Sequence, residues 1–197
     1  MKKTLIVLLF LAMAAGTASA QIGFSKGLIG GLNLATVGGD NAPGGASSVS
    51  NYAAGIFLEL NVPGPFSFEA NALYSIKGTK WNVGSVTYTD TYGYLDIPIL
   101  AKYHLPIPML SSSIYAGPMY STLLSAKTKQ EGGLLPGERD VKSNMTASDF
   151  GIVAGVGIGL ANIRIDARYD MGLTTLDKAG NFKMYNRVVG IYVGIGI

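Results

Sequence analysis

Apolar side chains alternate with polar or small ones along most of this chain, and no other feature constrains the fold as strongly. The alternation is clearest over 163–170, where apolar Ile163, Ile165, Ala167 and Tyr169 alternate with charged Arg164, Asp166, Arg168 and Asp170. A period of two places successive side chains on opposite faces of an extended chain, so it predicts β-strands. Comparable stretches predict eight strands, near 24–35, 51–62, 66–77, 92–105, 113–125, 149–160, 163–173 and 185–197.

The connections between these stretches alternate in length. Long polar connections cover 36–50, 78–91, 126–148 and 174–184, whereas shorter turns cover 63–65, 106–112 and 161–162. Outer-membrane barrels have an even number of strands, with long loops outside the cell and short turns in the periplasm. The pattern therefore predicts an all-β fold, an eight-stranded antiparallel up-and-down transmembrane β-barrel.

The first twenty residues have the organisation of a secretory signal peptide. Lys2 and Lys3 precede an apolar core over 5–15, and Ala-Ser-Ala at 18–20 fits the small-residue cleavage site. We therefore expect residues 1–20 to be removed and residues 21–197 to form one barrel domain. No later segment reaches the length of apolar sequence that a membrane-spanning helix needs, so any crossing would use strands.

We expect the aliphatic face of the strands to point outward into lipid. The opposite face is often glycine, as at 155, 157 and 159, and small residues suit a crowded barrel interior. Aromatic residues of the apolar face also gather near strand ends, and such girdles mark the two membrane interfaces. The expected periplasmic girdle contains Phe24, Phe66, Phe68 and Tyr103, and the outer girdle contains Tyr52, Tyr74, Phe150 and Tyr169. A soluble, secreted, lipocalin-like barrel would reverse this orientation and is kept as an alternative.

The charged residues of the opposite face would then lie inside the barrel. An eight-stranded barrel has an interior that side chains just fill, and unpaired charges there would be costly. We therefore expect a structural network of paired charges in the lumen, formed by Glu59, Glu69, Asp96, Lys102, Arg164, Asp166, Arg168 and Asp170. A filled lumen favours a structural or envelope-interaction role, with a narrow channel as the first alternative.

Enzymatic chemistry has little support in the sequence. A lipid-modifying outer-membrane enzyme, a further alternative, would need a base beside a nucleophile. His104 is the only histidine, and we expect it to face inward at the periplasmic end near Ser111 to Ser113. Without a cysteine or a second histidine, the usual ligands of a metal cluster are missing. We therefore expect no enzymatic activity, no catalytic residues, no cofactor and no metal.

The charge balance bears on possible partners. Without Lys2 and Lys3, the 15 basic residues fall to 13 against 12 acidic ones, so a nucleic-acid partner is not expected. We expect a monomer in the cell outer membrane that contacts outer-membrane lipid and lipopolysaccharide, the barrel-assembly machinery and other envelope proteins. The charged connection over 126–148 is expected to be a solvated loop, or a contact for lipopolysaccharide phosphates or another envelope protein.

Four short motifs suggest a family. GGLNLA (30–35), ALYSIKG (72–78), YLDIPIL (94–100) and YAGP (115–118) occur in an order and spacing that resemble the PorT-like outer-membrane β-barrel family of the Bacteroidetes type. The resemblance covers essentially the whole chain after the signal peptide. It implies an outer-membrane location and insertion by the barrel-assembly machinery, and it supplies no shared activity or site residues. Pro98 and Pro118 lie within predicted strands and are expected to mark bulges or local defects.

Overall fold

A computed structural model describes residues 22–133 and 136–197. The expected signal peptide over 1–20 lies outside the described residues. The elements within them are β1 (Gly23–Gly38), β2 (Val49–Asn61), β3 (Phe66–Val83), β4 (Val86–Leu105), β5 (Ser111–Glu131), β6 (Gly137–Asp140), the 3-10 helix η1 (Lys142–Asn144), β7 (Ser148–Leu160), β8 (Ile163–Gly172) and β9 (Tyr185–Gly196). In this part of the chain no helix is long and apolar enough to span a membrane.

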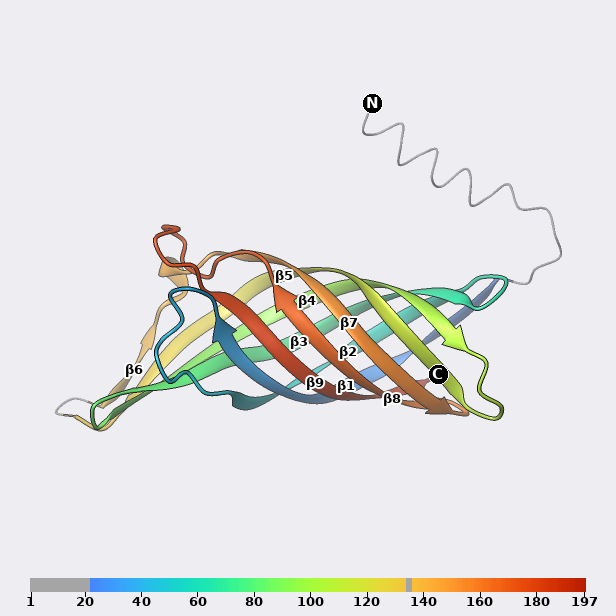
Figure 1. The fold of residues 1–197 in the computed structure, drawn as a ribbon, viewed down its shortest axis with the longest axis horizontal. Helices are drawn as coiled ribbons and strands as arrows, with labels where there is room; N and C mark the ends of the chain where they lie inside the picture. The colour runs from blue at the N-terminus through green and yellow to red at the C-terminus, as the bar shows by residue number, and fades with distance from the viewer. Residues whose placement is uncertain (1–21, 134–135) are drawn as a thin grey trace, which may run out of the picture.

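Eight of these strands close into an antiparallel barrel (Figure 1). Each pairs with its neighbour along the chain, β5 pairs with β7, and β1 pairs with β9 to complete the ring. The ninth strand, β6, pairs only with the last residues of β5. The predicted all-β, eight-stranded, up-and-down barrel is therefore confirmed, and its strands overlap the eight stretches expected from the sequence.

Short turns and long connections lie at opposite ends of the barrel (Figure 1). The short-turn end contains residues 62–65, 106–110 and 161–162. The other end contains the connections 39–48 and 173–184 together with β6. This sorting, which the alternating loop lengths predicted, gives the two ends of the lumen different surroundings.

Two of the long connections are shorter than expected, because the strands next to them continue further: 78–91 is a hairpin tip, as expected, but it is mostly paired. β3 and β4 continue through the expected loop 78–91 as far as the pair Val83 and Val86, around Gly84 with a positive φ of 61°. Within the expected loop 126–148, β5 runs to Glu131 and pairs with β6. The residues over 86–92 read Val-Thr-Tyr-Thr-Asp-Thr-Tyr, and β-branched and aromatic residues favour extended backbone. We call residues 78–91, 126–131 and 137–140 the extension, and the rest of the eight strands the wall.

In the wall, the predicted apolar face points outward, and the predicted charged face points inward together with some buried apolar side chains such as Leu73 and Val153. On β8, Ile163 and Ile165 are each 51% exposed, whereas Asp166 is 3% and Arg168 is 5% exposed. All eight aromatic residues of the two expected girdles also lie on the outer surface, each at least 38% exposed. The outward orientation of the apolar face is confirmed, and a barrel that buries its aliphatic side chains is excluded.

The two strand prolines interrupt pairing without shifting it. Asn71 and Ala72 of β3 have no ladder partners opposite Pro98, and the register is the same on both sides of the gap. In the β4–β5 ladder the gap lies at Ile99 and Leu100, next to Pro118. The register shift between these two strands is at Gly93 and Tyr94 instead. The prolines therefore mark local defects, as expected, and the alternative of a bulge at each proline is wrong.

Candidate functional site: the barrel interior and its two ends

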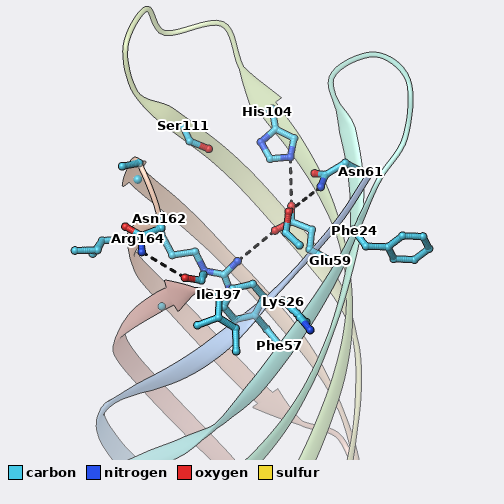
Figure 2. A pocket seen from close by; sticks show the side chains of 16 residues that line it. Phe24, Lys26, Phe57, Glu59, Asn61, His104, Ser111, Asn162, Arg164 and Ile197 are labelled. Carbon is cyan, nitrogen blue, oxygen red and sulfur yellow. Dashed lines mark hydrogen bonds and ion pairs between the residues drawn. The ribbon is translucent and has the colours of Figure 1, made fainter. Parts of the chain in front are cut away.

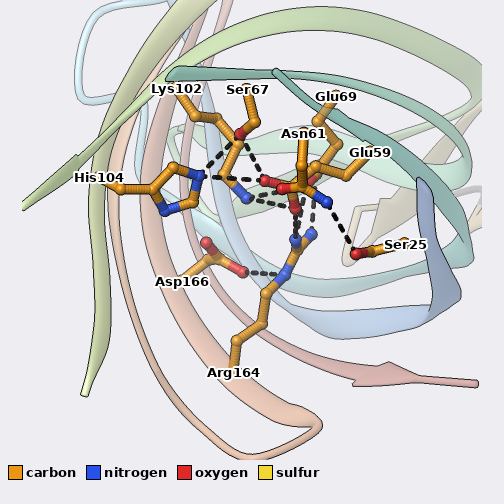
Figure 3. Close-up of polar contacts among 9 residues, drawn as sticks. All are labelled: Ser25, Glu59, Asn61, Ser67, Glu69, Lys102, His104, Arg164 and Asp166. Carbon is orange, nitrogen blue, oxygen red and sulfur yellow. Dashed lines mark hydrogen bonds and ion pairs between the residues drawn. The ribbon is translucent and has the colours of Figure 1, made fainter. Parts of the chain in front are cut away.

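The short-turn half of the lumen holds a cluster of five charged side chains from four strands (Figure 3). Lys102 Nζ lies 3.1 Å from Glu59 Oε2 and 2.9 Å from Glu69 Oε2. The Arg164 guanidinium donates from both terminal nitrogens to Glu69, with Nη2 to Oε1 at 2.7 Å, and its Nε lies 3.0 Å from Asp166 Oδ2. We call these residues the lower cluster.

Three carboxylates in the lower cluster face two cations, which leaves one negative charge. His104 Nε2 lies 3.4 Å from Glu59 Oε1, at the edge of the cluster. The Arg164 guanidinium also lies over the Phe57 ring at 4.1 Å. Pairing and ring contact together replace the hydration that these charges lose inside the barrel.

Two further ion pairs occupy the other half of the lumen. Lys77 Nζ lies 2.9 Å from Asp96 Oδ1, and Arg168 Nη2 lies 3.1 Å from Asp170 Oδ2. Buried tyrosines cover these cations, with Lys77 4.7 Å from the Tyr94 ring centre and Arg168 4.1 Å from that of Tyr192. Each cation therefore meets both a carboxylate and an aromatic face, which suits a charge that is fully removed from water.

Two rows of glycine make room for the charges of β8. β7 contributes Gly155, Gly157 and Gly159 on one side, and β9 contributes Gly190 and Gly194 on the other. A methyl group added at Gly157 would lie 2.6 Å from Asp166 Oδ1, and one added at Gly194 would lie 2.7 Å from Arg164 Nε. The glycines are thus spacers, and the interior is crowded, as the sequence predicted.

A pocket of about 470 Å³ opens into the short-turn end of the lumen (Figure 2). His104 and Asn61 lie at its rim, while Glu59, Arg164 and Phe57 lie deeper. The lower cluster therefore blocks the pocket from the rest of the lumen.

The polar groups near this rim are not arranged as a catalytic triad. Ser67 Oγ lies 2.8 Å from His104 Nε2 and donates to Glu59 Oε1 at 2.5 Å. In a catalytic triad the carboxylate orients the histidine through the ring nitrogen opposite the nucleophile, but here Ser67 and Glu59 share one nitrogen. Ser67 is also only 1% exposed, so a substrate cannot reach its hydroxyl. In the described part of the chain, no three His, Cys, Asp or Glu side chains lie where they could hold a metal ion.

An apolar cluster, which we call the cap, closes the opposite end of the lumen. Its buried members are Val37, Tyr92, Tyr94, Leu123, Ala126, Met145 and Leu176. Ala42 packs against it from the connection 39–48, and Met184 packs against it from 173–184. Backbone hydrogen bonds join the connections, as from Thr146 N to Leu176 O at 2.9 Å. The long connections therefore fold over the barrel mouth.

The outer face of the extension carries exposed ion pairs. Lys127 Nζ lies 2.6 Å from Glu138 Oε1, and Lys129 Nζ lies 2.6 Å from Glu131 Oε1. The hydrogen bond and the charge of Glu138 raise the pKa of Lys127, and those of Glu131 raise the pKa of Lys129. Lys129 in turn lowers the pKa of Glu131. Exposed pairs of this kind contribute little stability, in contrast to the buried pairs of the lumen.

The structure places all eight predicted lumen residues inside the barrel, and each takes part in at least one ion pair. They do not form one network, because Asp96 pairs with Lys77 and Arg168 pairs with Asp170. The prediction omitted Lys77, although it shares a face with Glu69 in the alternation of β3. It also missed the partner of His104, which is Ser67 on a neighbouring strand and not one of Ser111 to Ser113.

A closed barrel with a lipid-facing apolar surface, aromatic girdles and a filled interior defines the class of small outer-membrane β-barrel proteins. The family model for the outer membrane protein beta-barrel domain matches residues 16–178. The chain belongs to this family and is a protein of the cell outer membrane. In such barrels the short turns face the periplasm and the long connections face outward, so the cap and the extension lie outside the cell.

Several solved structures are similar to this chain at low sequence identity. The attachment invasion locus protein Ail of Yersinia pestis is 13% identical, with a TM-score of 0.46, over 88% of this chain and 98% of that one. Neisserial surface protein A is 13% identical, with a TM-score of 0.48, over 90% and 99%. The N-terminal β-barrel domain of Pseudomonas aeruginosa OprF is 11% identical, with a TM-score of 0.36, over 88% and 99%. A comparison with curated proteins finds no significant match.

Proposed function

We propose that this chain is a plugged outer-membrane barrel with a structural, envelope-interaction role. The wall anchors it in lipid, and the extension and cap present a surface outside the cell. One observation carries this proposal, namely that the lumen is blocked twice, by the lower cluster and by the cap. A narrow channel would need a continuous hydrated path past both, and the interior of an eight-stranded barrel leaves little space for one.

Single-channel recording in planar bilayers tests the plug. We expect refolded protein of residues 21–197 to give no discrete current steps under conditions in which a porin conducts. A double variant, Glu69→Ser with Arg164→Ser, removes both members of the bidentate pair and is expected to give brief openings. Reproducible steps from the unaltered protein would contradict the proposal and favour the narrow channel.

We also propose that the protein has no enzymatic activity. The enclosed Ser67 and the position of His104 at the periplasmic end support this, because lipid-modifying chemistry on the cell surface needs an accessible nucleophile near the outer leaflet. Mass spectrometry of lipid A from cells with the protein, without it and with His104→Ala is expected to give three identical spectra. A modification that depends on both the protein and His104 would overturn this part of the proposal.

The finer assignment to PorT-like barrels is a further proposal, supported by the way its motifs are used. YLDIPIL directs Tyr94, Asp96 and Leu100 inward, and YAGP directs Tyr115 inward. These motifs therefore encode the filling of the lumen.

We propose a monomer that is inserted by the barrel-assembly machinery and contacts lipid and lipopolysaccharide. Heat-modifiability gels after depletion of that machinery test insertion, and light scattering in detergent tests the oligomeric state.

A further inference from the structure

A cleft of about 260 Å³ lies outside the cell, between the inner face of the extension and the cap. Its lining includes Trp81, Asp90, Tyr92, Asn144, Asp177 and Met184. One wall comes from β3 and β4, the opposite wall comes from η1 and the connection 173–184, and the floor is part of the apolar cap. The cleft shares Tyr92, Met145 and Leu176 with the cap, and it has no lining residue in common with the pocket at the short-turn end.

Trp81 is held in one orientation at the edge of this cleft. Its Nε1 donates to Asp90 Oδ2 at 3.2 Å, and Asp90 Oδ1 accepts from Thr128 Oγ1 at 2.6 Å. Its ring stacks on Tyr88, with centroids 4.3 Å apart and planes 13° apart. An aromatic side chain fixed by both a hydrogen bond and a stack loses little conformational entropy on binding a ligand.

The opposite wall is also fixed before any ligand arrives. Met145 and Asp177 form a β-bridge, and Lys178 N donates to Asn144 O at 3.2 Å. The Asp177 carboxylate accepts from the backbone N–H groups of residues 179, 181 and 182. The two connections therefore hold Asn144 and Asp177 in place across the cleft from Trp81.

The lining selects the chemistry of a ligand. Among the described residues no lysine or arginine lines the cleft, so its two carboxylates disfavour phosphate, sulfate and other anions. Both carboxylates already accept hydrogen bonds from within the protein, so they gain less from binding a cation. What remains is a fixed ring face beside planar groups that accept and donate hydrogen bonds. This combination fits a neutral, polyhydroxylated ring, whose C–H face packs on an aromatic side chain while its hydroxyl groups meet amide and carboxylate groups.

We propose that this cleft binds a neutral saccharide unit of a polysaccharide outside the cell. The proposal rests on the envelope-interaction role above and names the class of ligand for it. Its fixed walls make the cleft a recognition site that a saccharide enters without rearrangement of the protein. A cationic peptide is the main competing ligand, and the experiment below separates the two.

Trp81 is the sole tryptophan of the chain, so all tryptophan fluorescence comes from the edge of the cleft. We would titrate the refolded protein with a panel of neutral trisaccharides of glucose, galactose, mannose and N-acetylglucosamine, with trilysine and with inositol hexaphosphate. Zwitterionic detergent micelles are required, because alkyl glycoside detergents carry sugar head groups. We expect a saturable change in Trp81 emission with at least one neutral sugar, unchanged by added salt.

Asn144→Ala is the test variant, because it removes an exposed amide from the cleft and leaves Trp81 in place. We expect it to weaken sugar binding about tenfold, as loss of hydrogen bonds to a ligand does. Asn162→Ala is the matched control, since it makes the same change in the turn 161–162 at the other end of the barrel, far from the lining of the cleft. Heat-modifiability gels test whether both variants fold.

The proposal is overturned if no sugar gives a saturable change, if trilysine alone binds and salt abolishes it, or if the two variants bind sugar equally. Current steps in bilayers would contradict the plugged barrel, but they would not contradict saccharide binding. If the barrel gives no current and the titration fails, only the saccharide proposal is contradicted.

Discussion

The wall and the extension are parts of the same strands, yet they place apolar and polar side chains on opposite faces. In the wall portion of β4, Leu95 points outward and Asp96 points inward. In its extension portion, the threonines at 87, 89 and 91 lie on the outer face, while Tyr88 faces inward beside Trp81 of β3. On β4 the period stays at two from the wall into the extension, so the medium around the strand decides which face is apolar.

The change of face locates the edge of the bilayer. On β3, exposed Tyr74 belongs to the outer girdle, whereas exposed Lys80 lies six residues further on. The boundary therefore falls close to Gly78 on β3 and Thr91 on β4. Beyond it the free edge is β6, a strand of four residues with three charges, and short charged edges resist pairing with other chains.

The largest contrast should come from breaking an ion pair in each region. Arg164→Ala leaves Glu59, Glu69 and Asp166 with Lys102 alone, and we expect it to cost about 3–5 kcal/mol of folding free energy. Lys127→Ala breaks the exposed pair with Glu138 and should cause no measurable change. Urea titrations of both variants in lipid vesicles measure this difference. Equal losses would show that the lumen pairs are as weak as surface ones.

The second largest difference in stability should come from a charge added to the outer face of each region. Val156 lies about midway along β7 on the lipid-facing side, and Val156→Arg should cost about 2–4 kcal/mol, as arginine does near the bilayer midplane. Thr89→Arg adds the same charge to the outer face of the extension, where water meets it, and should leave stability unchanged. A large loss from Thr89→Arg would place the extension inside the bilayer.

Added volume should give a smaller contrast. A methyl group at Gly190 would collide with the Tyr192 ring, which also contacts the Arg168 guanidinium, so we expect Gly190→Ala to cost about 1–3 kcal/mol. Nothing lies within 4 Å of the same group at Gly137 in β6, and Gly137→Ala is the control. Thermal unfolding followed by gel mobility compares the two variants. No loss at Gly190 would mean that the lumen can repack.

The smallest effect concerns pH. Lys129 lowers the pKa of Glu131 in the folded protein, so the stabilisation from this pair exists above the unfolded pKa and is lost as pH falls through the folded pKa. Both side chains are exposed, and we expect no change in unfolding within error over that range. NMR titration should instead show the Glu131 pKa return to its ordinary value in Lys129→Ala. An unchanged pKa would show that Lys129 does not pair with Glu131 in solution.

The sequence predicts the wall well and the extension poorly, for one physical reason. A lipid-facing strand must be apolar on one side, so the residue type predicts that Ile163 points outward and Arg164 points inward. In the extension both faces are partly polar, and the threonines over 87–91 read as a loop unless their β-propensity is weighed. The cap was not predictable, because Ala42, Met145 and Leu176 come from connections without periodicity and meet only through tertiary packing. The ion pairs of the lumen were predictable in part. Alternation shows that a charged side chain points inward, but it does not show which side chain is its partner.

The two-residue turn at Gly84 and Ser85 has a practical and an evolutionary consequence. A Cβ added at Gly84 meets no other atom within 4 Å, and neither residue belongs to the cap or to the saccharide cleft. We expect insertions there to leave the cap intact, whereas insertions into 39–48 or 173–184 would disrupt its packing. Epitope tags and fluorophores for surface labelling belong at this tip, and we expect antigenic drift under antibody or phage pressure to concentrate there.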